Sequence, residues 1–519
     1  MILDIGVDNL PDWNKPGAFS AGRDPLGLQA ASVRLYTGLL PGLTNVTNRL
    51  RYFSFYCWVV RQFELRHHSA AEDKWKLFIR RAEAIYVLAS RIGDNEGAGG
   101  MAGSNWAGDY LELPSEQEFD FSAWTDRPGK EEQYLKAPRG NFGQFYVASM
   151  LEMGMLEEHT APVYAVTEKY GLQLATAFDK ACPKASILLL DAIETGAVTR
   201  ESCELISEEA HPSLLREHSD ETRLLREYLC GERESDPSAR ARRASLWNIL
   251  SIIKQTSLAS ENDLRRELYV QNNTAAQANS ELATNLQTWR AYMVNEFCHI
   301  TLELLLNALT HCVNGNRTSS INQIAEHLVS AYLKQASAQS RPIADLAQEV
   351  ALPDLLAEHE LGHDISEIVR NNIEAPSDGD TANAVKLLLS LWNRWGSDRE
   401  FVRILHTATV SGRSAAGIFG MLDRLANEPA GEALAALIRK FIISNHLLIA
   451  GQKLSSSGTF TYRFIVDEGQ LVDGVPAKYD FTTPRIGNLI RFAEDARLLG
   501  ADGEVTEVGK AFLRAVQPI

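Results

Sequence analysis

Cysteine is scarce in this chain of 519 residues, and none of its six cysteines belongs to a C-x-x-C pair. Several of them lie inside apolar helical runs, where a free thiol packs as a small hydrophobic side chain. This distribution argues against a disulfide scaffold and indicates a reducing compartment. The cysteines are Cys57, Cys182, Cys203, Cys230, Cys298 and Cys312.

Long hydrophobic runs are also absent. The longest, such as Phe441 to Ile449, are too short or too interrupted to span a bilayer. Residues 1–8 lack the basic region and the apolar core of a secretory signal. We therefore expect a soluble, cytoplasmic protein that has no membrane partner.

Positive charge is in deficit, because 51 Lys and Arg face 67 Asp and Glu and the formal net charge is -16. Such a chain repels phosphate backbones, so it could bind nucleic acid only through a local basic patch. The one basic cluster of the middle region, residues 240–243, adjoins acidic residues and is interpreted as a solvated helix start. The charge therefore argues against non-specific nucleic-acid binding.

Convincing catalytic motifs are scarce in the sequence. The sharpest candidate is the H-E-x-x-H motif of residues 359–363. On one helix, His359 and His363 would face the same side and bind zinc, while Glu360 would polarise a bound water. This hypothesis describes a zinc-dependent hydrolase with zinc as its cofactor.

The surroundings of this string favour a different interpretation. Gly362 could end one helix, and residues 364–367 (Asp-Ile-Ser-Glu) then match a capping box that opens the next. The imidazoles of His359 and His363 would belong to different helices and could not share a metal. We therefore expect no cofactor and no catalytic residue, with the zinc hydrolase as the alternative.

The chain contains a short sequence motif that occurs twice, and each copy is called a phrase. Residues 166–171 read VTEKYG and residues 505–509 read VTEVG. Each phrase follows an apolar helix that is predicted to stop near a glycine, Gly154 in one case and Gly500 in the other. The Thr-Glu pair is typical of a helix start. Each segment resembles the closing half of a winged-helix module, which implies docking on DNA or on other proteins.

The first of these segments is acidic. Its predicted recognition helix, residues 141–158, carries Glu152, Glu157 and Glu158 but no Lys or Arg. Because acidic side chains repel phosphates, we expect this segment to bind protein or to be buried.

The second segment is more basic. Its predicted recognition helix carries Arg485, Arg491 and Arg497, and Lys510 follows the predicted wing. These cations could contact duplex DNA. A plain packing domain without a ligand is the alternative.

The rest of the pattern is mainly helical. Apolar helices are predicted from about residue 46 to 67, from 71 to 91 and from 295 to 313, and helices with short breaks follow over 318–450. Alternation typical of a strand occurs only at 460–466. We predict a mainly α, multi-domain helical protein with two winged-helix-like modules that carry small β-hairpins. The predicted domains are residues 1–131 (helical, with an irregular leader), 132–182 (first module), 183–450 (helical) and 451–519 (β-hairpin and second module).

Two arginines, Arg49 and Arg51, stand at the start of the first apolar helix. A buried guanidinium is costly unless it is paired, so each should have a carboxylate, carbonyl or phosphate partner. An internal clamp with Asp or Glu is one interpretation, and an anion or nucleic-acid contact is the other. The two side chains lie about 200° apart around a helix, which argues against a single shared pocket.

The same region carries a resemblance to known proteins. Residues 39–58 read LLPGLTNVTNRLRYFSFYCW. This string resembles the N-terminal signature of an uncharacterised prokaryotic family from mobile-element and phage-defence gene clusters. The resemblance implies a bacterial component of a multi-protein antiphage defence system, and it brings no catalytic residues with it. We therefore expect a non-catalytic recognition or scaffold subunit that binds protein subunits encoded nearby. Duplex DNA could also be bound, and the candidate residues are Arg49, Arg51, Arg485, Arg491, Arg497 and Lys510.

Overall fold

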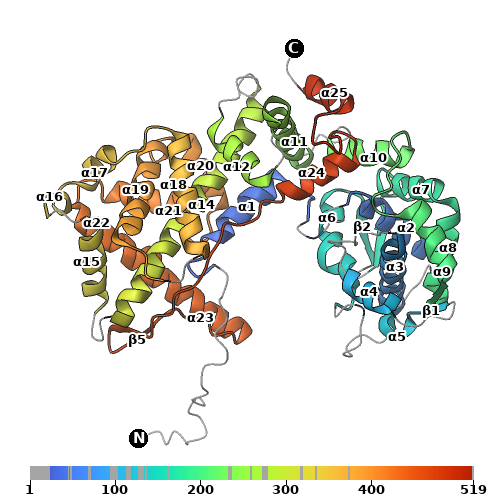
Figure 1. Cartoon of the computed structure of the whole chain (residues 1–519), viewed down its shortest axis with the longest axis horizontal. Coiled ribbons are helices and arrows are strands. Elements are labelled where there is room, and N and C mark those ends of the chain that lie inside the picture. Colours follow the sequence, from blue (N-terminus) through green and yellow to red (C-terminus); the bar gives the residue numbers. More distant parts are fainter. Residues whose placement is uncertain are drawn as a thin grey trace, which may run out of the picture. The chain divides into compact units, whose positions relative to one another are not determined.

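The computed structural model is mainly helical, with 71% helix and 6% strand (Figure 1). The predicted fold class is confirmed at this level. The structure describes residues 24–44, 46, 49–67, 72–93, 103–112, 118–126, 134, 137–160, 163–231, 237–257, 260–271, 279–315, 320–333, 336–371 and 374–516. Most of the predicted leader lies outside these residues.

The chain folds into two compact units, each built from separate stretches of sequence. Unit 1 contains residues 1–35 and 287–482, and unit 2 contains residues 36–286 and 483–519. The predicted domain borders near residues 131, 182 and 450 do not coincide with the borders of these units. The difference arises because residues 483–519 pack with helices that lie several hundred positions earlier, an association that local composition does not reveal.

Unit 2 is a helical assembly with two small antiparallel sheets, one of β1 and β4 and one of β2 and β3. Two of the three borders between the units fall within α1 (Gln29–Leu39) and α14 (Ser280–Gly315), and the third lies between Thr482 and Thr483. The other elements of unit 2 are α2 (Arg51–Arg66), α3 (Glu72–Gly93), α4 (Ser104–Glu112), β1 (Glu118–Asp120), α5 (Ser122–Thr125), η2 (Phe142–Tyr146), α6 (Val147–Glu152), β2 (Leu156–Thr160), β3 (Val163–Val166), α7 (Gly171–Ala181), α8 (Pro183–Thr195), β4 (Ala197–Thr199), α9 (Arg200–Ala210), α10 (Asp220–Leu229), α11 (Pro237–Thr256), α12 (Glu261–Val270), α24 (Ile486–Asp495) and α25 (Glu507–Val516).

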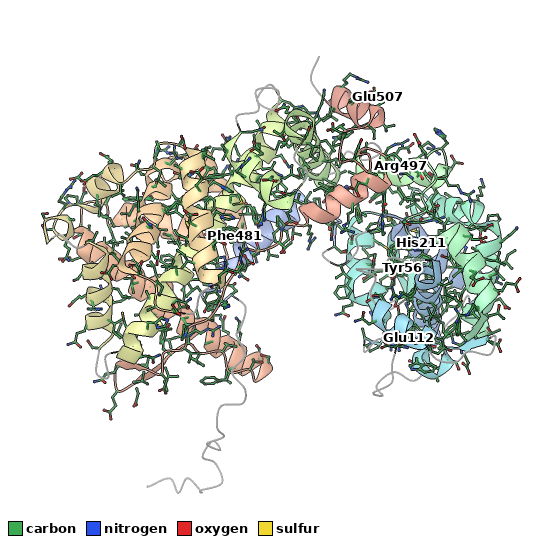
Figure 2. The ribbon with its side chains drawn as sticks, viewed as in Figure 1. Tyr56, Glu112, His211, Phe481, Arg497 and Glu507 are labelled. Atoms are coloured by element: carbon green, nitrogen blue, oxygen red, sulfur yellow. The ribbon has the colours of Figure 1, made fainter. Side chains whose placement is uncertain are left out.

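Helix α2 lies at the centre of unit 2, with α3 and α7 packed beside it (Figure 1). Every residue of α2 from Arg51 to Val60 is buried, as expected for a helix that is apolar nearly all round. The hydroxyl of Tyr56 donates to the buried carboxylate of Glu83 on α3 at 3.0 Å (Figure 2). This helix therefore lies inside a multi-helix core.

A buried ion pair fixes the first turn of α2. Arg51 and Glu221 are each 1% exposed, and two nitrogens of Arg51 donate to the two oxygens of Glu221 at 3.1 and 3.0 Å. The hydroxyl of Ser54 also donates to Glu221, and Arg51 donates to the carbonyls of Glu209 and His211. Burial acts to lower the pKa of Arg51, but Glu221 raises it above its ordinary value. Arg51 therefore stays charged and joins three segments of the chain.

Unit 1 is also helical, and one small antiparallel sheet of β5 and β6 adjoins its helices. Apart from its parts of α1 and α14, its elements are α15 (Ile321–Tyr332), α16 (Ala336–Gln339), α17 (Ile343–Glu349), α18 (Leu355–Asn371), α19 (Asp378–Trp395), α20 (Arg399–Ala408), α21 (Ala415–Arg424), α22 (Ala430–Leu437), η3 (Ile438–Ser444), α23 (Asn445–Ser457), β5 (Ile465–Asp467) and β6 (Gln470–Val472).

The strand predicted at residues 460–466 forms only at its end, where β5 begins. The amide of Arg463 instead donates to the buried ring of His446 at 2.7 Å. The backbone amide at this position therefore bonds to a helix side chain and not to a neighbouring strand. Glu468 and Gly469 form the turn between β5 and β6, with φ of 48° and 81°, as in a tight hairpin.

The continuous helical stretch Ala430–Ser457 is long and apolar enough to cross a membrane by composition. In its most apolar window, 67% of the residues are buried inside the structure. This is the environment of a core helix, so the stretch gives little support for a membrane span.

The buried pair predicts a specific pattern of stability. Glu221→Ala leaves the guanidinium of Arg51 buried without its carboxylate, and we expect the free energy of unfolding to fall by about 3–5 kcal/mol. The double variant Arg51→Met/Glu221→Leu removes both charges and should recover most of this loss. Urea denaturation followed by circular dichroism measures both effects. Equal stability of Glu221→Ala and the wild type would contradict the assignment.

Candidate functional site

The two sequence phrases adopt the same local fold within unit 2. The first repeat, residues 147–181, consists of α6, the β2–β3 hairpin and α7. The second repeat, residues 486–516, consists of α24, a single antiparallel bridge between Leu499 and Val505, and α25. Each repeat is therefore a helix, a short antiparallel pair and a final helix.

A threonine organises the first repeat. The amide of Thr167 donates to the carbonyl of Met155 at 3.0 Å, and its hydroxyl donates to the carbonyl of Gly154 at 2.7 Å. The same hydroxyl accepts from the amide of Gly171 at 3.2 Å. One side chain thus joins the exit of the first helix to the start of the last one.

Thr506 makes the same bonds in the second repeat. Its amide donates to the carbonyl of Leu498 at 3.1 Å, and its hydroxyl donates to the carbonyl of Arg497 at 2.6 Å. The hydroxyl accepts from the amide of Gly509 at 3.1 Å, which is the bond of a helix N-cap. The threonine cap predicted from the sequence is therefore present at α25. In the first repeat α7 begins only at Gly171, its N-cap residue is Tyr170, and no side chain caps it.

The glycines of the two phrases are required by a close backbone contact. A Cβ atom on Gly171 would lie 2.0 Å from the carbonyl oxygen of Met155. On Gly509 it would lie 2.3 Å from the carbonyl oxygen of Leu498. The last helix of each repeat can approach the hairpin only because this position has no side chain.

The glycine predicted to end the second apolar helix is not the structural counterpart of Gly154. Gly154 has a left-handed φ of 64°, and the equivalent position of the second repeat is Arg497 with φ of 62°. Gly500 lies farther along, where its amide donates to the carbonyl of Glu504 in the turn. The sequence pairs Gly154 with Gly500, but the structure pairs it with Arg497, because a left-handed residue at this position need not be glycine.

The acidic residues of the first repeat lie mostly on the hairpin and not on its first helix. Helix α6 ends at Glu152, whose carboxylate accepts from the amide of Gly42 at 3.1 Å. Glu157 and Glu158 belong to β2 and are exposed. The prediction of a helix over residues 141–158 is therefore corrected, because Gly154 turns the chain into the strand.

Most of the basic residues predicted for the second repeat have partners within the protein. Arg485 donates to the carbonyl of Leu43 and lies over the ring of Tyr36. Arg497 donates to the carbonyl of Leu215 at 2.8 Å, and Lys510 pairs with Glu507 at 2.9 Å. Figure 2 shows Arg497 near the end of α24 and Glu507 at the start of α25. These three cations therefore bind partners within unit 2.

Arg491 differs from them. It lies on α24, it is exposed, and it makes no hydrogen bond or ion pair with another residue that the structure describes. Its guanidinium is therefore available for an external anion.

The two arginines near the start of α2 have separate carboxylate partners, as the internal-clamp interpretation requires. Arg49 is 32% exposed and pairs at 2.9 Å with Asp495 at the end of α24. Asp495 also accepts from the amide of Leu50, and burial raises its pKa although Arg49 opposes the shift. Arg51 is buried against Glu221, so it presents no surface to an external phosphate.

The H-E-x-x-H string lies on one helix, and the predicted break at Gly362 is wrong. Helix α18 runs without interruption from Leu355 to Asn371. A Cβ atom on Gly362 would lie 2.4 Å from Phe297, so the glycine permits close packing on α14. The rings of His359 and His363 therefore share one helix, with centroids 6.4 Å apart.

A zinc site needs more than these two histidines. Catalytic zinc is usually held by three protein ligands. In the part of the chain that the structure describes, no group of three His, Cys, Asp or Glu residues could hold a metal ion. His359, Glu360 and His363 with their described surroundings therefore do not fit a zinc centre.

A buried polar cluster in unit 1 was not predicted as a site. Glu296, His299 and Glu303 on α14 are fully buried, and His299 lies 2.9 Å from Glu303. Burial acts to lower the pKa of His299, but Glu303 raises it to about 9. Burial raises the pKa of Glu303 to about 7. The spacing of these residues, i, i+3 and i+7, is the sequence signal that could have placed them on one face of a helix.

This cluster joins distant segments of unit 1 to α14. The amide of Gln29 lies 3.2 Å from the ring of His299, and the backbone amide of Thr482 donates to Glu296 at 2.5 Å. The side chain of Asn295 also donates to the carbonyl of Leu28 at 3.1 Å. We interpret the cluster as a structural element that holds the ends of unit 1 together.

The close contact of Gly509 predicts the effect of a minimal substitution. Gly509→Ala forces the added methyl group against the carbonyl of Leu498, and we expect a loss of about 1–3 kcal/mol in the free energy of unfolding. Gly420→Ala is the matched control, since its added Cβ meets nothing closer than 3.9 Å. Thermal denaturation of both variants tests this, and equal melting temperatures would contradict the packing described here.

The left-handed backbone at Arg497 predicts a difference between two truncations. Arg497→Gly and Arg497→Ala both remove the guanidinium, but only glycine adopts positive φ without steric cost. We expect the glycine variant to be more stable by about 1 kcal/mol in urea denaturation. A more stable alanine variant would show that the chain does not adopt this conformation.

Comparisons with known proteins identify no relative of the two repeats. No protein-family model, no curated protein and no solved structure matches the chain. The surfaces of the molecule and the sequence resemblance of residues 39–58 are therefore the available guides to its function.

Proposed function

We propose that the protein is a non-catalytic recognition or scaffold subunit of a bacterial multi-protein complex, acting in antiphage defence in the cytoplasm. The observation that carries the proposal is the pair of equivalent helix–hairpin–helix repeats in unit 2. Their likeness to winged-helix modules supports a role in docking, and the sequence of residues 39–58 supports the defence setting.

The repeats are built as rigid supports. In each, a threonine hydroxyl bonds both to the carbonyl after the first helix and to the amide of the equivalent glycine, Gly171 or Gly509. Both repeats pack on α2 through aromatic contacts. Phe53 of α2 meets Phe492 of the second repeat edge to face at 5.9 Å. Phe55 of α2 meets Phe178 on α7 of the first repeat at 5.9 Å between ring centroids. A preorganised support of this kind favours specific docking because little conformational entropy is lost on binding.

The charges of the exposed residues favour protein partners over duplex DNA. The hairpin of the first repeat exposes Glu157 and Glu158, which would repel phosphates and attract a basic protein surface. Among the cations predicted for DNA, Arg491 is exposed and has no partner within the described residues. Binding to duplex DNA generally requires several such contacts.

The experiment is co-expression of the chain with the products of the genes beside its own. We expect a stable complex that the charge reversal Glu157→Lys/Glu158→Lys weakens, because both side chains lie on the exposed hairpin. The matched control is Glu204→Lys/Glu208→Lys on α9, which changes the net charge equally at two exposed positions. Size-exclusion chromatography with light scattering measures the amount of complex.

Two outcomes would contradict the proposal. One is a monomeric wild-type protein in the presence of every neighbouring product. The other is a salt-dependent shift of duplex DNA by the free protein that Arg491→Ala weakens, with no protein partner, which would place recognition on DNA.

A further inference from the structure

Three fully buried titratable side chains of unit 1 lie on one helix, α14. Glu296, His299 and Glu303 are each 0% exposed. The Nε2 atom of His299 lies 2.9 Å from a carboxylate oxygen of Glu303, and its Nδ1 atom lies 3.8 Å from a carboxylate oxygen of Glu296. One imidazole is therefore close to two carboxylates in a place that is out of contact with solvent.

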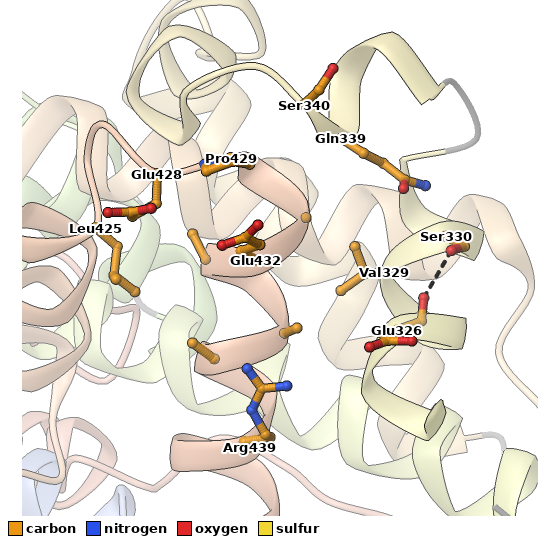
Figure 3. Close-up of a pocket in the computed structure, with 14 residues that line it drawn as sticks. Glu326, Val329, Ser330, Gln339, Ser340, Leu425, Glu428, Pro429, Glu432 and Arg439 are labelled. Carbon is orange, nitrogen blue, oxygen red and sulfur yellow. Dashed lines mark hydrogen bonds between the residues drawn. The ribbon is translucent and has the colours of Figure 1, made fainter. Parts of the chain in front are cut away.

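Other carboxylates of unit 1 have a different environment. Glu326, Glu428 and Glu432 line a surface groove of about 770 Å³, and all three are exposed (Figure 3). Water hydrates such charges, so they need no partner. A fully buried carboxylate lacks this hydration and is stable only with a compensating charge or a proton. One proton therefore matters far more in the cluster on α14 than at this groove.

The position of Glu303 requires a proton at Nε2 of His299 or on the carboxylate itself. Neither oxygen of Glu303 has a hydrogen-bond partner among the residues that the structure describes, so its charge depends on ion pairing. At 2.9 Å, a carboxylate oxygen and an unprotonated ring nitrogen would direct lone pairs at each other and repel. An imidazolium removes this repulsion and compensates both carboxylates. The closed cluster therefore suits a protonated His299.

Charged and titratable groups of other segments also act on the cluster. Burial acts to lower the pKa of His299, but Glu303, with Glu296 and Asp24, raises it to about 9. Burial also lowers the pKa of Lys453, and Asp24 and Glu303 oppose that shift. The groups from outside α14 are Asp24 before α1, Arg413 beside Gly27, His446 and Lys453 on α23, Arg463 after α23, and Tyr479.

The cluster is attached to the segment that leads into α1. The side-chain amide of Gln29 lies 3.2 Å from Nε2 of His299, and the carboxylate of Asp24 accepts from the amide of Leu28 at 2.8 Å. If His299 loses its proton, Asp24, Glu296 and Glu303 act on one another without the imidazolium charge between them. The resulting repulsion acts directly on the segment that carries Asp24.

We propose that His299 is a proton-operated latch, which holds residues 24–29 on α14 while it is protonated and releases them when it loses its proton. Histidine serves in this way in other pH-sensitive proteins. This inference does not depend on the proposed recognition function, because it concerns only the interior of unit 1.

The direction of the pH dependence follows from proton linkage. The pKa of His299 is raised from 6.5 to about 9 in the folded protein, so its stabilisation is complete below about pH 6.5 and is lost as the pH rises through about 9. Burial raises the pKa of Glu303 to about 7, so the ionisation of Glu303 weakens the latch in the same direction. Unit 1 should therefore hold residues 24–29 less tightly at alkaline pH.

Amide hydrogen–deuterium exchange of the full-length protein tests the latch. It is measured at pH values of about 6.5, 7.5 and 8.5 and corrected for the pH dependence of intrinsic exchange. We expect the protection factor of residues 29–35 in α1 to fall by about ten-fold or more across this range. The protection factor of α11 in unit 2 is the internal reference and should stay within about two-fold.

A double variant assigns the effect to the cluster. His299→Gln/Glu303→Gln removes both titrating groups and keeps polar side chains, so we expect its α1 protection to change by less than about two-fold with pH. Glu400→Gln/His406→Gln on α20 is the matched control, because it makes the same two changes at exposed positions of unit 1. This control should keep the pH dependence of the wild type. Circular dichroism checks that each variant is folded.

Three results would overturn the proposal. The first is α1 protection in the wild type that does not change with pH, and this series remains decisive if the double variant does not fold. The second is an equal fall in α11, which would assign the effect to the whole protein. The third is the full wild-type pH dependence in a folded double variant, which would assign the titration to other groups.

Discussion

The burial of the Arg51–Glu221 pair at the start of α2 is the constraint on which unit 2 depends. A helix that is apolar nearly all round cannot fold by itself, so its neighbours must enclose it. The paired guanidinium fixes the positions of these neighbours, because it binds Glu221 on α10, the carbonyl of Glu209 in the last turn of α9 and the carbonyl of His211 just after α9. A buried charge that loses its partner is far more costly than a lost surface contact, so the pair tolerates little displacement.

This central helix also holds both repeats. The second repeat is joined to the start of α2 by Arg49 with Asp495, and the amide of Leu50 donates to the same carboxylate. The hairpin of the first repeat is joined to the end of α2, because the amide of Val166 donates to Glu64 at 3.0 Å. The repeats share their internal bonds but differ in what they expose, since one presents acidic hairpin residues and the other presents Arg491.

Local sequence signals predicted the elements whose chemistry is local. The apolar stripe around Phe53 predicted α2, and the Val-Thr-Glu phrase with its glycine predicted both repeats. Features set by distant contacts were not predicted. Gly362 has the sequence signature of a helix end, but its packing against Phe297 keeps α18 continuous. The discontinuous units and the partners of Arg49 and Arg51 depend on residues up to 446 positions away, beyond the reach of any local pattern.

Hydrogen–deuterium exchange of the full chain, measured at increasing denaturant, tests most directly whether one buried helix holds both repeats. We predict that the amides of α2, α7 and α24 exchange through one shared opening, with the same free energy and the same dependence on denaturant. Exchange from α24 at a much lower free energy than from α2 would contradict the account, because the second repeat would then open without disturbing the helix proposed to hold it.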